Sequence, residues 1–324
     1  MKAKVQSFNK LLFKNKKIQI KDTILVAGSP RSGTTWLMEI LGTLPEYAYL
    51  FEPLNPIWFP ESFEVGFRSK THIKPESNWS EGEEYLKKIF AGQIANLPIK
   101  DNTISDILHS FSIKNVMNHF LGNKLIVKST NMNRILPWIT KRFQLKNTFF
   151  IIRHPCATIA SQIKTGLCGY RPNFPPYCDI FPTIDDILNE MAEIDDFDSN
   201  LVNKLKNIKT KEEVLAASWC LDNYFILSHA KTYPLTTIIY EKLVNEGQNE
   251  IKRIFDSIDV KNIPKSAYSC LKKPSALTLK EDYKFINMPD QQLSKWKKQL
   301  SEKQIEKILK IVSYFDIALY SKKQ

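Results

Sequence analysis

The stretch TILVAGSPRSGTTW, residues 23 to 36, constrains the fold of this chain more than any other feature. An apolar run leads into a short loop that contains two glycines, and a helical pattern begins near Thr34. Gly28 and Gly33 permit the backbone angles and the close approach that such a turn needs. This arrangement aims backbone N–H groups and the positive end of a helix dipole at one point. The stretch therefore predicts an anion site, and the anion we expect there is a phosphate.

Further apolar runs are typical of buried strands, and stretches with helical spacing separate them. With the first run, they cover residues 23–28, 47–52, 125–129, 148–153 and 236–241. Alternation of this kind predicts an α/β fold whose central sheet is mostly parallel and is flanked by helices on both faces.

The domain organisation is expected to be simple. Without an internal repeat, a low-complexity linker or a break in composition, residues 1–324 are expected to form a single domain. Residues 165–215 run from an aromatic, proline-rich loop into acidic helical patterns, and we interpret them as an insertion over the rim of the sheet. The insertion is either a lid or acceptor-site element, or surface decoration.

Two helices are predicted from spacing alone. Trp36, Leu37 and Ile40 lie on one stripe of the helix that follows the loop. Near the C-terminus, Ser301 and Gln304 form a capping box ahead of apolar residues at helical spacing. The second helix is expected to be structural.

The loop lacks the lysine of an ATP-binding loop. The Walker pattern G-x-x-x-x-G-K-[ST] places lysine after its second glycine, whereas this chain has Thr34 there. A γ-phosphate would lose its main cationic partner, and no recognisable magnesium-binding aspartate follows a strand, so a kinase or NTPase is disfavoured. Arg31, inside the loop, is instead placed to reach a group attached to the bound phosphate.

Composition narrows the classes of partner. The chain has 46 Lys and Arg residues against 34 Asp and Glu, a formal net charge of +12. This excess favours an acidic ligand, although lysines that only solvate the surface explain it equally well. Arginine-rich tracts and interleaved aromatic and basic runs are absent from the sequence, so no nucleic-acid partner is expected.

Cysteine usage and hydropathy bear on the compartment. The 5 cysteines form no CxxC pair and no Cys/His cluster at zinc spacing, so we expect free thiols and no metal site. No apolar run approaches the ~20 residues that span a bilayer. We therefore expect a soluble, cytoplasmic protein without a membrane span.

A second basic motif follows the fourth apolar run. In TFFIIRHPCATIAS, residues 148 to 161, the strand ends at Arg153, Pro155 suits the first turn of a helix, and Ser161 follows within that helix. An arginine at a strand end is also common as a surface ion-pair partner. Arg153 becomes a strong candidate for ligand binding because this motif follows the glycine loop along the chain. The neighbouring His154 is expected to be structural.

Together the two motifs resemble those of the sulfotransferases that use 3′-phosphoadenosine 5′-phosphosulfate (PAPS). In that family a P-S-G-T-T-type loop binds the 5′-phosphosulfate, and an Arg…Ser pair at this spacing binds the 3′-phosphate, which ATP and ADP lack. The PRSGTT form looks most like the protein-tyrosine, carbohydrate and bacterial branches. The resemblance implies a P-loop-like sulfotransferase fold. It also implies that the donor is bound by Pro30, Arg31, Ser32, Gly33, Thr34, Thr35, Trp36, Arg153, Ser161, Tyr240 and Lys295.

Shorter matches extend the resemblance over most of the chain. The segment IVKST resembles the family strand whose lysine contacts the sulfuryl oxygens, which here is Lys128. IIYEKLV resembles a strand end that places Tyr240 near the nucleotide, and LSKW resembles a late loop in which Lys295 covers the 3′-phosphate. Trp36 corresponds to a tryptophan that stacks near adenine, with core packing on its helix as the alternative.

Sulfuryl transfer needs an acceptor oxygen in line with the sulfur, a base, and cations that stabilise the leaving oxygen. By the resemblance, Arg31 and Lys128 supply the cations and no metal is required. Many cytosolic members carry a histidine two residues after the lysine, whereas this chain has Thr130. The tyrosyl and carbohydrate branches instead place a glutamate where Glu52 stands, which makes it the candidate general base. The alternative is that Glu52 caps a turn or pairs with a lysine.

The resemblance thus implies an enzyme that transfers a sulfuryl group from PAPS to an acceptor hydroxyl. The stretch FEPLNP looks most like glycan-directed members and favours a carbohydrate or glycoconjugate. A small alcohol, a phenol, a lipid or a peptide tyrosine stays open, because fold similarity cannot choose among them. A P-loop kinase or NTPase and a non-catalytic binding module are the alternatives of other classes. The oligomeric state is left open.

Overall fold

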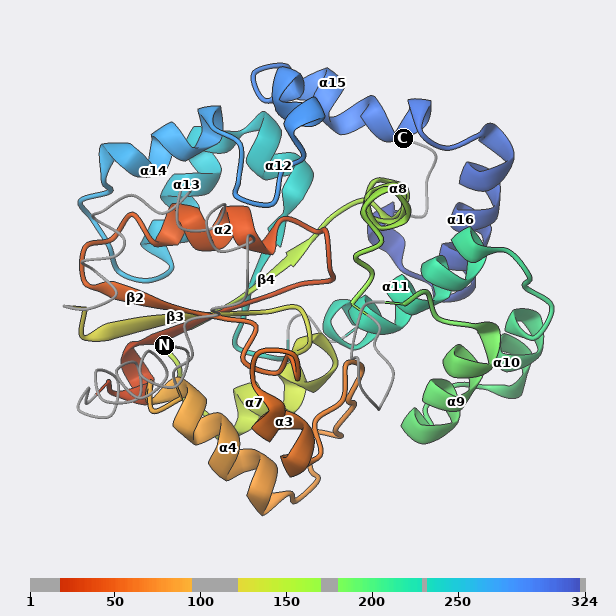
Figure 1. The fold of residues 1–324 in the computed structure, drawn as a ribbon, viewed down its shortest axis with the longest axis horizontal. Helices are drawn as coiled ribbons and strands as arrows, with labels where there is room; N and C mark the ends of the chain where they lie inside the picture. The colour runs from red at the N-terminus through yellow and green to blue at the C-terminus, as the bar shows by residue number, and fades with distance from the viewer. Residues whose placement is uncertain (1–17, 95–121, 170–179, 229–231, 321–324) are drawn as a thin grey trace, which may run out of the picture.

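The computed structural model describes residues 18–94, 122–169, 180–228 and 232–320, whose arrangement is shown in Figure 1. At its centre is a five-stranded sheet in the order β2-β3-β1-β4-β5, and all four pairings are parallel. This confirms the predicted α/β fold with a parallel central sheet. The strands are β1 (Thr23–Ala27), β2 (Tyr47–Phe51), β3 (Lys124–Ser129), β4 (Asn147–Ile152) and β5 (Thr236–Ile239).

The predicted strands lie within two residues of the observed ones, and the main correction concerns the last. The run 236–241 is strand only as far as Ile239, because Tyr240 and Glu241 open a helix. Tyr240 and Leu243 are buried one helical turn apart, a spacing that favours a helix. The β-branched residues before Tyr240 favour a strand, but they do not extend it past Ile239.

Alternate residues of each strand face two separate cores. In β1, Ile24 and Val26 belong to one core, and Leu25 and Ala27 belong to the other. Figure 1 shows the helices of the first core above the sheet, with others below it and beyond its carboxyl ends. The first core is covered by α2 (Thr34–Leu41), α12 (Tyr240–Asn245), α13 (Gly247–Asp256), α14 (Lys265–Ser269) and η3 (Cys270–Lys272).

The second core is larger and extends past the sheet. Its main helices are α4 (Ser80–Phe90), α7 (Leu136–Arg142), α8 (Pro155–Thr165), α9 (Ile184–Ile194), α10 (Ser199–Leu205), α11 (Lys211–Ser228) and α16 (Glu302–Tyr314). Shorter elements complete the described chain: η1 (Ile20–Asp22), α3 (Pro60–Val65), η2 (Asn133–Ile135), η4 (Lys280–Phe285), α15 (Pro289–Ser294), η5 (Lys295–Lys298) and η6 (Ala318–Tyr320). Among the described residues, no helix has the length and apolar character needed to cross a bilayer.

Local sequence signals match the helix termini. Gly33 precedes α2 with φ 104°, and the predicted stripe of Trp36, Leu37 and Ile40 is buried. Ser301 and Gln304 form the predicted capping box at the start of α16. Four cysteines are free thiols, as expected, and Cys178 lies outside the described residues.

The described part of the predicted insertion 165–215 is tied to the sheet by a buried ion-pair network. Arg134, in η2, donates to Glu190 of α9 at 2.8 Å and to Asp222 of α11 at 2.9 Å. Lys70 adds a second cation 2.7 Å from Asp222. Residues 170–179 of the insertion lie outside the described residues.

We expect Asp222→Asn to lower the free energy of unfolding by about 3 kcal/mol, because it leaves the buried charges of Arg134 and Lys70 without their common anion. Urea unfolding measures the change. The control is Asp256→Asn at an exposed position of α13, and its stability is expected to stay within about 0.5 kcal/mol of the parent's. Equal stabilities of the two variants would show that the network does not hold the helices.

Candidate active site

Each strand of the sheet ends immediately before a residue with a distinctive role. Gly28 follows β1, Glu52 follows β2, Thr130 follows β3, Arg153 follows β4 and Tyr240 follows β5. Because all five strands are parallel, these residues meet at one edge of the sheet, where open α/β sheets bind their ligands.

The loop between β1 and α2 is packed too closely for any residue but glycine at two positions. A Cβ on Gly28 would lie 2.4 Å from the carbonyl oxygen of Ile151, and one on Gly33 would lie 2.7 Å from the Tyr240 ring. Gly33 also has a left-handed φ of 104°, which favours glycine. The loop backbone is therefore held directly against β4 and α12.

Side chains from two distant helices hold the outer part of this loop. Gln162 of α8 donates to the carbonyl of Pro30 at 3.1 Å, and Asn223 of α11 donates to the hydroxyl of Ser29 at 3.1 Å. Both donors are buried. Neither residue could be predicted from the sequence, because each lies more than a hundred positions from the loop and belongs to no local motif.

Arg31 links the two sequence motifs in space. Its Nε donates to Ser161 Oγ at 3.0 Å, and its Nη2 donates to the carbonyl of Leu277 at 3.1 Å. Arg153 in turn donates to the carbonyl oxygen of Arg31 at 3.2 Å. Burial, with the nearby charge of Arg153, lowers the pKa of Arg31 to about 10. Arg31, Arg153 and Ser161 thus form one cationic region.

The direction of the Arg31 side chain bears on its predicted roles. The guanidinium contacts Ser161, one of the two residues expected at the 3′-phosphate. Its predicted catalytic role beside Lys128 requires the side chain to reach another part of the site, and this role stays a prediction. The backbone of Arg31 has φ 70°, a conformation that non-glycine residues rarely adopt and that marks functional loops.

The guanidinium of Arg153 packs against an aromatic ring. Its guanidinium lies 4.4 Å from the centroid of Tyr240, whose ring contacts Trp36 at 5.6 Å. Trp36 donates to the carbonyl of Cys270 at 2.9 Å and belongs to the first core. Trp36 therefore packs in the core, as in the second of the two predicted roles. Its position near adenine stays a prediction.

Glu52 and Lys128 form a second, separate charged centre. Their side chains make a buried ion pair, 8% and 3% exposed respectively. Thr130 donates to Glu52 through its backbone N–H at 2.9 Å and its hydroxyl at 2.9 Å. Glu52 also has a left-handed φ of 48°. The threonine that replaces the histidine of many family members is therefore a hydrogen-bond partner of the carboxylate.

Lys295 lies close enough to Arg153 for the two charges to interact, but it is already paired with a carboxylate, and its role at the 3′-phosphate stays a prediction. Its Nζ lies 2.7 Å from Asp282 Oδ2, on a segment that also contains Leu277. Asp282 was not among the predicted residues, because an exposed-looking acidic residue in KEDYKF carries no motif.

His154 is structural, as expected. Its Nδ1 accepts from the Cys156 N–H at the start of α8, and its ring stacks on Trp296 at 4.8 Å. Burial and the charges of Arg153 and Lys297 lower its pKa to about 4, so the ring is neutral at pH 7.

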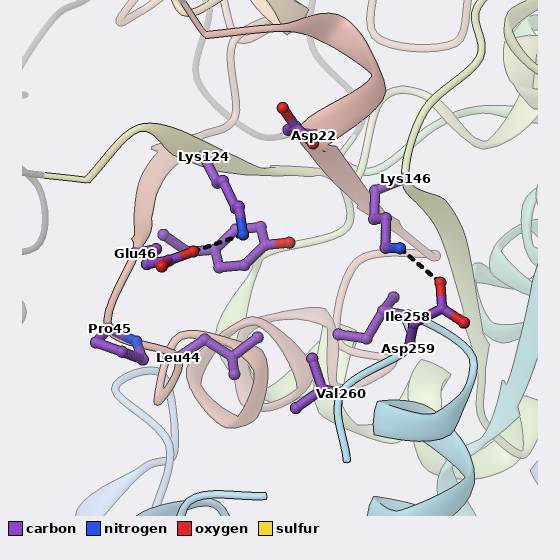
Figure 2. Close-up of a pocket in the computed structure, with 10 residues that line it drawn as sticks. Asp22, Leu44, Pro45, Glu46, Lys124, Lys146, Ile258, Asp259 and Val260 are labelled. Carbon is purple, nitrogen blue, oxygen red and sulfur yellow. Dashed lines mark hydrogen bonds and ion pairs between the residues drawn. The ribbon is translucent and has the colours of Figure 1, made fainter. Parts of the chain in front are cut away.

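A cavity of about 370 Å³ lies at the opposite edge of the sheet (Figure 2). Its lysines, Lys124 and Lys146, are paired with Glu46 and Asp259 respectively. Because these charges neutralise one another and stand at the amino ends of the strands, the cavity is separate from the candidate active site.

Comparison with known proteins assigns the family. The family model described as the sulfotransferase domain matches residues 21–315, most of the chain. Among solved structures, the sulfotransferase domain from the olefin synthase of Synechococcus PCC 7002 is 19% identical, with a TM-score of 0.40 over 90% of this chain and 94% of that one. No curated protein matches the chain. From the extent of the family match, the chain belongs to the sulfotransferase domain family and is a sulfotransferase enzyme.

Proposed function

We propose that this sulfotransferase uses PAPS as its donor and transfers the sulfuryl group to a hydroxyl of a carbohydrate or glycoconjugate, with Glu52 as general base. The observation that carries the donor assignment is the meeting of Arg31, Arg153 and Ser161 beside the glycine loop. A nucleotide with phosphates at both its 5′ and 3′ positions matches a loop of backbone donors next to a cluster of cations.

The residues present fit such a donor. Two buried polar atoms, Ser32 Oγ and Arg153 Nε, have no hydrogen-bond partner among the described residues, and both belong to the predicted donor site. The close packing at Gly28 and Gly33 fixes the loop backbone against β4 and α12. Unpaired buried donors cost free energy unless a ligand or water satisfies them, so these atoms support an anionic ligand.

Different residues are assigned to bind each part of the donor. We assign the 5′-phosphosulfate to the loop and the first turn of α2, and the 3′-phosphate to Arg153, Ser161 and Lys295. Bound PAPS supplies an activated sulfuryl group. The loop residues assigned to its 5′ side are Pro30, Arg31, Ser32, Gly33, Thr34 and Thr35, with Trp36 and Tyr240 beside the nucleotide.

The hydrogen bonds of Glu52 support its proposed role as the base that takes the acceptor's proton. Lys128 and the Thr130 hydroxyl bond its Oε1, while the Thr130 N–H bonds its Oε2. These donors hold the carboxylate in one orientation at the end of β2. In our proposal the acceptor hydroxyl gives its proton to Oε2, and Lys128, released from part of its pairing, contacts the sulfuryl oxygens.

The side chains next to this centre support a polyhydroxylated acceptor. Asn131 and Asn133 follow Thr130, and the Asn131 Oδ1 and both amide atoms of Asn133 are buried without a partner among the described residues. Amides both donate to and accept from hydroxyl groups. Glu190 of α9 is anchored through Arg134 beside them, so we propose that the insertion 165–215 contributes to the acceptor side of the single domain.

The donor assignment predicts a preference for adenosine 3′,5′-bisphosphate over ATP in titration calorimetry. Arg153→Met is expected to weaken binding of the bisphosphate about tenfold or more, because a charge-assisted bond to the 3′-phosphate is lost. Arg253→Met, at an exposed position of α13, is the matched control and is expected to bind like the parent. Equal affinities for ATP and the bisphosphate in the parent would contradict the assignment.

Glu52→Gln is expected to reduce turnover about 100-fold or more, because the amide cannot accept a proton. Binding of adenosine 3′,5′-bisphosphate should change by less than about twofold, which shows that the site is intact. Glu46→Gln, at the opposite end of β2, provides the matched control. Turnover of Glu52→Gln at the parental rate would remove Glu52 from the mechanism while leaving the enzyme class unchanged.

A panel of acceptors tests the substrate class. With radiolabelled PAPS, we expect label to enter sugars or glycoconjugates and not phenols, small alcohols, lipids or tyrosine peptides. Asn133→Ala should then raise the KM for the sugar more than it lowers kcat, because binding partners are lost while the base is kept. Labelling of a phenol or peptide in place of sugars refutes the carbohydrate assignment.

A further inference from the structure

We propose that Asp282 is an internal counter-ion of the donor site, which pairs with Lys295, one of the cations assigned to the 3′-phosphate, and is exchanged for that phosphate when the donor binds. This inference rests on the proposed function and goes beyond it, because it assigns the control of donor affinity to a residue outside both motifs. It makes Asp282 a competitor of the ligand and not a ligand itself.

The position of Asp282 is the first support. Its Oδ2 lies 2.7 Å from Lys295 Nζ, and its Oδ1 accepts from Lys164 Nζ at 3.4 Å. The side chain is only 13% exposed. Burial by itself raises the pKa of this carboxyl, but Lys295 and Lys164 outweigh it and hold the pKa below its ordinary value. Asp282 is therefore a carboxylate set between two lysines.

The cations around it form one cluster. The charge of Asp282 acts on Arg31, which in turn is coupled to Arg153. Burial lowers the pKa of Lys295, and the charges of Arg153 and Lys164 lower it further. Four cations therefore share this region, and the carboxylate of Asp282 lies next to them. Such a cluster repels itself, and an anion that enters it is bound strongly.

A second carboxylate, Glu281, is adjacent but different. It pairs with Lys164 from the solvent side and is 64% exposed. An exposed pair of this kind contributes little, because water and salt screen it. The two neighbours thus carry the same charge on the same element, and only Asp282 reaches into the cluster.

The backbone around Asp282 is held independently of its carboxylate. Ala276 donates to Glu39 of α2 at 2.8 Å, Leu277 accepts from Arg31, and Gln292 donates to the Tyr240 hydroxyl at 2.9 Å. The segment 275–298 therefore remains attached to α2 and α12 when the Asp282 side chain turns away. Exchange requires a change of side-chain rotamer and no opening of the fold.

Competition of this kind acts on substrate and product alike. The nucleotide that leaves after sulfuryl transfer keeps its 3′-phosphate, so the cations that hold the donor also hold the product. A carboxylate tethered beside them returns to Lys295 as the product departs. We infer that Asp282 lowers the affinity for both nucleotides and favours product release, a step that limits turnover in many enzymes.

The test compares two nucleotides that differ only in the 3′-phosphate. In titration calorimetry, Asp282→Asn should bind adenosine 3′,5′-bisphosphate about tenfold more tightly than the parent, because the competing charge is gone. Its affinity for adenosine 5′-monophosphate should change by less than about twofold. Glu281→Gln is the matched control and should bind both nucleotides like the parent. Asp282→Glu, which keeps the charge, should restore weak binding of the bisphosphate.

Other outcomes overturn the inference. If Asp282→Asn binds both nucleotides more tightly, or both more weakly, the residue acts on the segment 275–298 and not as a stand-in for the 3′-phosphate. Equal effects of Asp282→Asn and Glu281→Gln on nucleotide binding would show that any lost negative charge in this region has the same effect, and that Asp282 has no specific role. If the parent itself does not prefer the bisphosphate to the monophosphate, the proposed donor is wrong; if it does and Asp282→Asn binds no tighter, the inference alone fails.

Discussion

The contact between the β1–α2 loop and its neighbours is the constraint on which the site depends. β1 lies beside β4 in the sheet, so the loop that follows β1 meets the residue that follows β4. The approach is close because Gly28 has no Cβ to meet the carbonyl of Ile151. With a larger residue there, the loop would move away from β4, and Arg31 and Arg153 would no longer share one region.

The site has two centres that differ in their balance of charge. Around Arg153 cations are in excess, and the carboxylate of Asp282, 13% exposed, offsets part of their repulsion. At the end of β2, in contrast, Glu52 is matched to Lys128 and to two donors of Thr130. An excess of cations suits the binding of a multiply charged nucleotide, whereas a matched pair holds a carboxylate ready without drawing anions to it.

Much of the site was predictable because its residues stand next to strand ends. Apolar runs with few polar interruptions identify parallel strands, and the carboxyl ends of such strands meet at one edge whatever their order. Gly28, Glu52 and Arg153 were located in this way. The sequence predicts a strand at Tyr240, although a helix begins there. The β-branched residues before it hide the change from strand spacing to helical spacing.

The sequence by itself determined the fold class, the glycine loop after the first strand and the positions of the two arginines, since each depends on short-range spacing and on conformations that glycine or proline favours. Only the tertiary structure decided which residues complete the site. Asn223, Gln162 and Asp282 reach it from helices and loops far along the chain. Long-range contacts of this kind arise from how helices pack on a sheet, and packing leaves no local pattern in the sequence.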